Sequence, residues 1–148
     1  DRKAGTLAVS TPLTETATLP AGDLAVKKLR VKDASKFMTA AAISLDGKPL
    51  TESDSILVIH LSNISQSGAG YGSSTLLRAW GNSPELLVER CTATLELECG
   101  GTPWRVAALA LDGSETGEVP GSLKNGVSRF TADTTAFPDG VLASHLSR

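Results

Sequence analysis

Residues 91–99 read Cys-Thr-Ala-Thr-Leu-Glu-Leu-Glu-Cys, from Cys91 to Cys99, and alternate apolar and polar side chains without an exception. A period of two over this length predicts a β-strand with one face on a core and the other in water. Half-covered strands of this kind belong to antiparallel sheets, because strands of parallel sheets are usually covered on both faces. The stretch therefore predicts an antiparallel sheet.

Turn signals are frequent on both sides of this strand. The short apolar or alternating runs are separated by Asp46-Gly47, Gly100-Gly101, Asp112-Gly113 and Asn125-Gly126. Such pairs supply the positive φ angles that tight hairpin turns need. Many short strands at this spacing predict an all-β fold, namely a two-sheet antiparallel β-sandwich of the jelly-roll or immunoglobulin-like kind.

The same reading gives the individual elements. We expect strands near residues 6–10, 13–18, 24–31, 37–45, 56–62, 75–79, 92–99, 104–111, 115–119, 127–132 and 141–146. Residues 65–74 are rich in glycine and serine and are expected to form a mobile polar loop. A short helical turn can begin at Ser83-Pro84-Glu85, since serine caps helices and proline suits the first helical position.

Composition limits the class of protein. The chain has 148 residues, 41% of them apolar and 20% charged, so we expect one domain over residues 1–148 that folds without a metal or cofactor. A net charge of -2 gives no reason to expect a nucleic acid or a membrane as partner. The chain opens on Asp1 rather than Met, and we expect it to be a piece of a longer chain.

The two cysteines are expected to be small buried side chains. On one extended strand, Cys91 and Cys99 would lie roughly 26 Å apart, whereas a disulfide needs Cα atoms within about 7 Å. Neither has a histidine or aspartate at zinc-finger spacing.

Histidines and carboxylates give no catalytic signature. His60 lies in the run Ile56–Leu61, which is apolar on both faces and predicts a central strand. His145 follows Ser144, but neighbours on a strand point to opposite faces, so the two cannot act together. Glu96 and Glu98 share the polar face of one strand, which predicts solvated surface rather than an acid–base pair.

Three aromatic residues are the candidates for ligand binding. Tyr71, Trp80 and Trp104 could stack on the apolar C–H faces of a sugar, as flat aromatic rings do. The alternative is that they pack in the core or at the rim of the sandwich.

Three segments resemble a known family. They are residues 54–63 (ending in His60-Leu61-Ser62-Asn63), residues 80–88 (Trp-Gly-Asn-Ser-Pro-Glu-Leu-Leu-Val) and residues 106–120, which end in Gly-Glu-Val-Pro. Together with the phenylalanine strand at 128–131, they resemble the C-terminal β-sandwich that follows the (β/α)-barrel in large bacterial glycoside hydrolases. The likeness extends over roughly residues 40 to 148.

This resemblance implies a non-catalytic accessory domain, because the catalytic glutamates of that family lie in the barrel. It implies packing on the catalytic domain of the same parent chain, with a polysaccharide as a second candidate partner, and an extracellular or periplasmic location. Two alternatives remain open, a carbohydrate-binding module and a cell-surface protein-interaction domain. No catalytic role transfers to any residue of this chain.

Overall fold

The computed structural model describes residues 1–73, 76–81, 84–101 and 104–148, and within these ranges the regular structure consists of strands. The strands are β1 (Leu7–Ser10), β2 (Thr14–Leu19), β3 (Gly22–Ala25), β4 (Leu29–Ala34), β5 (Met38–Ser44), β6 (Ser55–Leu61), β7 (Ile64–Gln66), β8 (Gly70–Ser73), β9 (Leu76–Ala79), β10 (Leu86–Val88), β11 (Thr92–Glu98), β12 (Arg105–Leu109), β13 (Glu115–Glu118), β14 (Gly121–Lys124), β15 (Val127–Asp133) and β16 (Ala143–Ser147).

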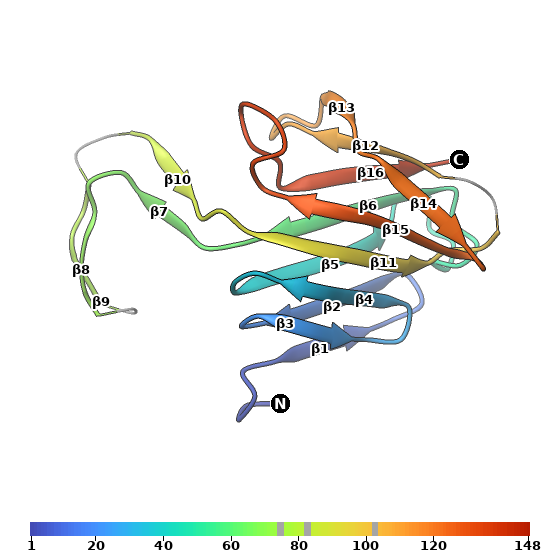
Figure 1. Ribbon diagram of the computed structural model, residues 1–148, viewed down its shortest axis with the longest axis horizontal. Helices are drawn as coiled ribbons and strands as arrows, with labels where there is room; N and C mark the ends of the chain where they lie inside the picture. The colour runs from blue at the N-terminus through green and yellow to red at the C-terminus, as the bar shows by residue number, and fades with distance from the viewer. Residues whose placement is uncertain (74–75, 82–83, 102–103) are drawn as a thin grey trace.

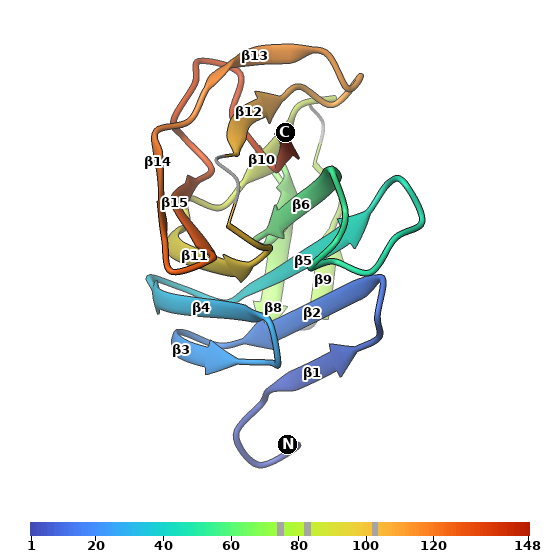
Figure 2. The ribbon, with the colours of Figure 1, turned by 90° about the vertical axis from the view of Figure 1, so that its right-hand side faces the viewer.

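Two antiparallel sheets pack face to face (Figures 1 and 2). The large sheet has seven strands in the order β1-β2-β5-β6-β16-β12-β13, and the small sheet has five in the order β14-β15-β11-β4-β3. The chain passes from one sheet to the other several times, for example from β4 to β5 and from β15 to β16. The predicted two-sheet antiparallel sandwich is confirmed.

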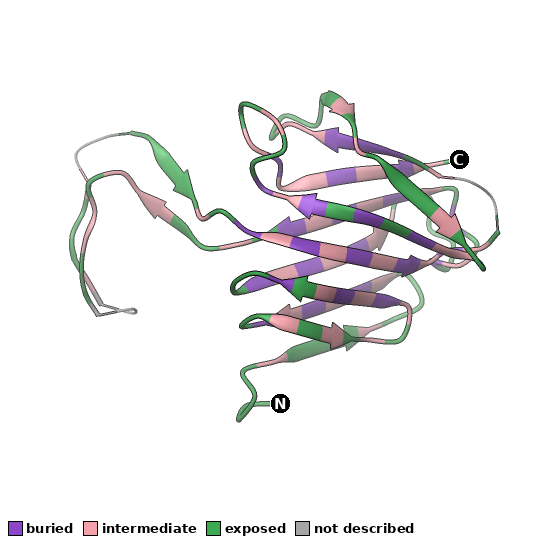
Figure 3. Cartoon of the chain, viewed as in Figure 1, coloured by how far each residue is buried: buried purple, intermediate pink, exposed green. Residues whose placement is uncertain are grey.

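The core lies between the sheets and is built from alternate residues of each strand (Figure 3). On β11 and its flanks every odd residue from Cys91 to Cys99 is buried and every even residue is partly exposed, so the predicted alternation is confirmed. Both cysteines are unpaired and buried in this core, as predicted. Across the gap, β5 and β6 contribute Met38, Ala40, Ala42, Ile56 and Val58.

The prediction of one strand over residues 24–31 was wrong, because a turn divides this stretch between β3 and β4. A carboxylate far away in the sequence forms the turn. Glu15 on β2 accepts hydrogen bonds from the N–H groups of Lys27, Lys28 and Leu29 at 3.1, 2.7 and 2.8 Å. A tertiary contact thus fixes a turn at residues 27–29, although the local sequence favours a strand.

The prediction of a loop at 65–74 was also wrong for most of its length, while Ser74 lies outside the described residues. Residues in this region form β7 and β8, which pair with β10 and β9 in two small antiparallel sheets. Together they form an arm, residues 63–89, that projects away from the sandwich (Figure 1). Pro84 and Glu85 are not helical, while Ser83 of the predicted helical turn lies outside the described residues.

Candidate functional site

The arm carries two of the three predicted aromatic residues. Trp80 follows β9 and is 78% exposed, and Tyr71 on β8 is 52% exposed. Gly81 sits so close to the turn after β7 that a Cβ there would overlap the carbonyl oxygen of Ser67. This close approach holds the Trp80 end of β9 against the turn that joins β7 to β8.

Trp104 lies apart from the other two. It follows the far end of β11 and packs, half-buried, against the core. The guanidinium of Arg148 covers its ring at 4.6 Å from the centroid, an arrangement in which the cation interacts favourably with the aromatic face. The structure therefore brings Tyr71 and Trp80 to one hairpin and places Trp104 at the rim of the sandwich.

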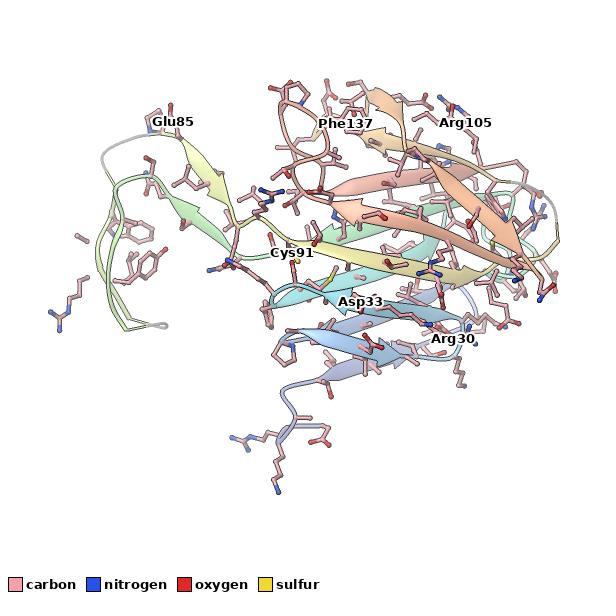
Figure 4. The ribbon with its side chains drawn as sticks, in the orientation of Figure 1. Arg30, Asp33, Glu85, Cys91, Arg105 and Phe137 are labelled. Carbon is pink, nitrogen blue, oxygen red and sulfur yellow. The ribbon has the colours of Figure 1, made fainter. Side chains whose placement is uncertain are left out.

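The root of the arm is held by hydroxyl groups. The Ser62 hydroxyl donates a hydrogen bond to the carbonyl oxygen of Glu89 at 2.6 Å. The N–H of Glu89 donates to the carbonyl oxygen of Asn63 at 2.8 Å. The hydroxyl of Thr134, after the end of β15, accepts a hydrogen bond from the N–H of Cys91 at 2.9 Å. Cys91 marks the point where the arm meets the sandwich (Figure 4). The arm therefore leaves the core from a fixed base.

The outer face of the large sheet carries a row of aliphatic side chains over β5, β6 and β16. In one row across the sheet, Ala41 of β5 lies opposite Ile59 of β6, which lies opposite Ala143 of β16. In the next row, Ile43 lies opposite Leu57. These side chains are all partly exposed.

On the described strands β1, β2, β5, β6 and β16 the outward-facing positions contain no Asp, Glu, Lys or Arg, although threonines, serines and His145 share this face with the aliphatic side chains. Beyond β16 the face becomes charged, because Arg105 of β12 lies opposite Ser147 and pairs with Glu115 of β13 at 2.6 Å.

The outer face of the small sheet is different. Arg30 and Lys32 of β4, Glu96 of β11 and Arg129 of β15 all point outward from it (Figure 4 labels Arg30). Glu96 lies 3.5 Å from the Lys32 ammonium and 3.9 Å from the Arg129 guanidinium. Glu96 and Glu98 thus occupy the polar face that the sequence predicted. The two outer faces of the sandwich thus differ, since the small sheet is charged across its centre and the large sheet is uncharged on β1, β2, β5, β6 and β16.

The histidines lie on opposite faces of the large sheet. His60 is buried on the inner side of β6, the central strand expected from the sequence, and burial lowers its pKa to about 4. His145 lies on the outer side of β16, while Ser144 beside it is buried, as predicted.

Sequence reasoning missed one close pair of catalytic residue types. Nε2 of His145 lies 2.8 Å from the hydroxyl of Ser55 on the neighbouring strand β6. Acyl transfer also needs a group that orients the histidine and donors for an oxyanion. The pair sits instead on the outer face of a regular sheet. Strand pairing between β6 and β16, invisible in the sequence, is what brings it together.

Within the described residues, no group of three or more His, Cys, Asp or Glu side chains is arranged to hold a metal ion. Nor does that part of the chain contain a helix with the length and apolar character needed to cross a membrane. No model of a known protein family matches the chain, and the curated proteins and solved structures gave no match either.

Proposed function

We propose that this chain is a non-catalytic accessory β-sandwich of a carbohydrate-active enzyme. In this proposal it packs against the catalytic domain of the same parent chain through the outer face of the large sheet. The uncharged row of aliphatic side chains on β5, β6 and β16 is the observation that supports the proposal. The resemblance of residues 40–148 to the sandwich of barrel-type glycoside hydrolases supplies the identity of the partner.

The energetics favour a covered face. An antiparallel sheet that faces water normally alternates apolar and polar residues, as β11 does. β6 instead presents Leu57, Ile59 and Leu61 outward while Ile56 and Val58 fill the core. Covering each of these partly exposed aliphatic side chains contributes up to about 1 kcal/mol. A partner surface over this row would therefore gain several kcal/mol without having to desolvate a charge.

The test places a charge in the face of the full-length protein. Ile59→Lys should uncouple the sandwich from its neighbour, so that one calorimetric unfolding transition becomes two. The matched control is Thr94→Lys on the outer face of the small sheet, which should leave the transition unchanged. Identical thermograms for both variants would count against the proposal, as would a reading frame without a catalytic domain.

A second candidate function is that of a carbohydrate-binding module. The observation that favours it is the 78% exposure of Trp80 on a rigidly based arm. Under this alternative, Trp80→Ala should abolish retention on a polysaccharide affinity gel while the unfolding midpoint stays unchanged. The accessory proposal expects no retention of the isolated chain on any polysaccharide, so one set of gels separates the two.

A further inference from the structure

A groove of about 570 Å³ runs between the arm and the adjacent end of the sandwich. One wall is β10, and the other is formed by residues 109–112 at the end of β12 and residues 138–142 before β16. Leu86 of the first wall is 70% exposed and Leu111 of the second is 93% exposed. Both walls therefore present aliphatic side chains to water, which is the mark of an interaction surface.

The loop that forms the second wall is held in place. Phe137 packs so closely on β13 that a Cβ at Gly117 would overlap its ring (Figure 4). The N–H of Gly140 donates to the carbonyl oxygen of Phe137 at 2.9 Å, and that of Val141 donates to the carbonyl oxygen of Thr134 at 3.1 Å. The groove is thus preformed, so a ligand need not order this wall.

The first wall consists of three successive strand residues. Leu86, Leu87 and Val88 all line the groove, although successive side chains of a strand point to opposite faces. A groove that touches three successive residues runs along the edge of β10. β7 occupies the other edge and contributes no residue to the groove lining.

The strand register identifies the backbone groups of β10 that do not bond to β7. Ladder bonds join Ser67 N–H to the Glu85 carbonyl oxygen and Glu89 N–H to the Asn63 carbonyl oxygen, so the odd-numbered residues of β10 pair with β7. The N–H and C=O groups of Leu86 and Val88 consequently point to the open edge. Such an edge can pair with an added strand.

The groove also has a charge. Asp112 and Asp139 are among its lining residues, and no Lys, Arg or His is among the described residues that line it. Hydrogen bonds from the hydroxyl and the N–H of Ser114 lower the pKa of Asp112, so its charge persists further into acid than that of an ordinary aspartate. A ligand with a cationic side chain therefore complements this site.

We infer that this groove binds an extended, apolar polypeptide segment that carries a lysine or arginine and adds as a strand to β10. The backbone edge selects an extended chain, the leucines select apolar side chains, and the two aspartates select a cation. The site is separate from the packing face on β5 and β6, and the inference does not rest on the accessory function proposed above.

The probe is a fluorescein-labelled synthetic peptide of alternating valine and threonine with one central lysine, flanked by serines. Fluorescence anisotropy should show saturable binding with a Kd of about 10–100 μM. A peptide with glutamate in place of lysine should bind at least about fivefold more weakly. A peptide N-methylated at alternate residues keeps its side chains but cannot pair with the strand, and it should bind more than about tenfold more weakly.

Matched variants locate the site on the protein. Leu87→Asp, in the groove, should weaken binding of the lysine peptide about tenfold, because an apolar contact is replaced by a charge that needs water. Ile64→Asp, on the far strand of the same ribbon, should leave binding unchanged. Circular dichroism of both variants shows whether the sandwich is intact, while the N-methylated peptide tests strand addition without altering the protein.

Three results would overturn the inference. The first is equal affinity for the lysine, glutamate and N-methylated peptides, and the second is no binding of any of them up to about 1 mM. The third is a dimer of the free chain in sedimentation velocity that Leu87→Asp dissociates, since the occupant would then be a second copy. Ile59→Lys should leave peptide binding intact, so failure here and failure of the accessory proposal are distinguishable.

Discussion

Among single residues, Glu15 shows how one buried carboxylate fixes a distant turn. It is 1% exposed, and its oxygens accept the Ser10 hydroxyl and the N–H groups of residues 27–29. Glu15→Ala should lower the free energy of unfolding in urea by about 3 kcal/mol, because it leaves buried donors unpaired. Glu15→Gln keeps an acceptor and should lose about half as much. Exposed Glu52→Ala is the control, and a midpoint for Glu15→Ala equal to that control would refute this role.

His60 makes the stability of the fold depend on pH. Burial lowers its pKa from 6.5 to about 4, against a smaller opposing influence of Asp133. Between these two pH values the unfolded chain binds more protons than the folded chain. The contribution of neutral His60 to the free energy of unfolding is therefore complete above pH 6.5, and it is lost as the pH falls from 6.5 through 4. The loss attributable to this residue should approach about 3 kcal/mol.

The measurement is urea unfolding of the wild type and of His60→Leu at several pH values. The difference between the two isolates the histidine, since both proteins keep the same carboxylates. Parallel pH profiles would show that His60 does not titrate as described.

At the scale of elements, the arm should open locally without unfolding of the sandwich. Gly81→Ala places a Cβ onto the Ser67 carbonyl oxygen and should loosen the β8–β9 hairpin. Trypsin should then cleave faster after Arg78, while the free energy of global unfolding changes by less than about 0.5 kcal/mol. Gly101→Ala, where a Cβ has open space, is the control. Unchanged cleavage would mean that this contact does not hold the hairpin.

The elements also show what the sequence could predict. Alternation predicted β11, and a run apolar on both faces predicted β6 as a central strand, because both patterns follow from burial alone. The turn between β3 and β4 was missed because its cause, Glu15, lies in another strand. β7 and β10 were missed because an arm has no core to impose a pattern. The run Ile56–Leu61 predicted apolar side chains on both faces of β6. The extent of the aliphatic row depends on the register of β5, β6 and β16, and pairing between distant strands cannot be predicted from a local pattern.

For the whole molecule, the difference between the two outer faces should determine where an apolar dye binds in solution. The isolated chain should bind an apolar fluorescent dye through the large sheet. The double variant Ile43→Lys/Ile59→Lys should reduce that fluorescence severalfold and lower the unfolding free energy by no more than about 1 kcal/mol, since both side chains are partly exposed. Thr94→Lys/Thr131→Lys on the small sheet should leave dye binding unchanged. Equal reductions by the two pairs would place the dye elsewhere.

The two ends of the arm belong to different layers of the sandwich. β6, which precedes it, lies in the large sheet, and β11, which follows it, lies in the small one. Because Ser62, Asn63 and Glu89 close the base with their own hydrogen bonds, the segment between them can lengthen, shorten or be replaced without disturbing the interior. This junction is a natural grafting point, where evolution or an engineer can exchange a recognition element while the scaffold beneath it stays the same.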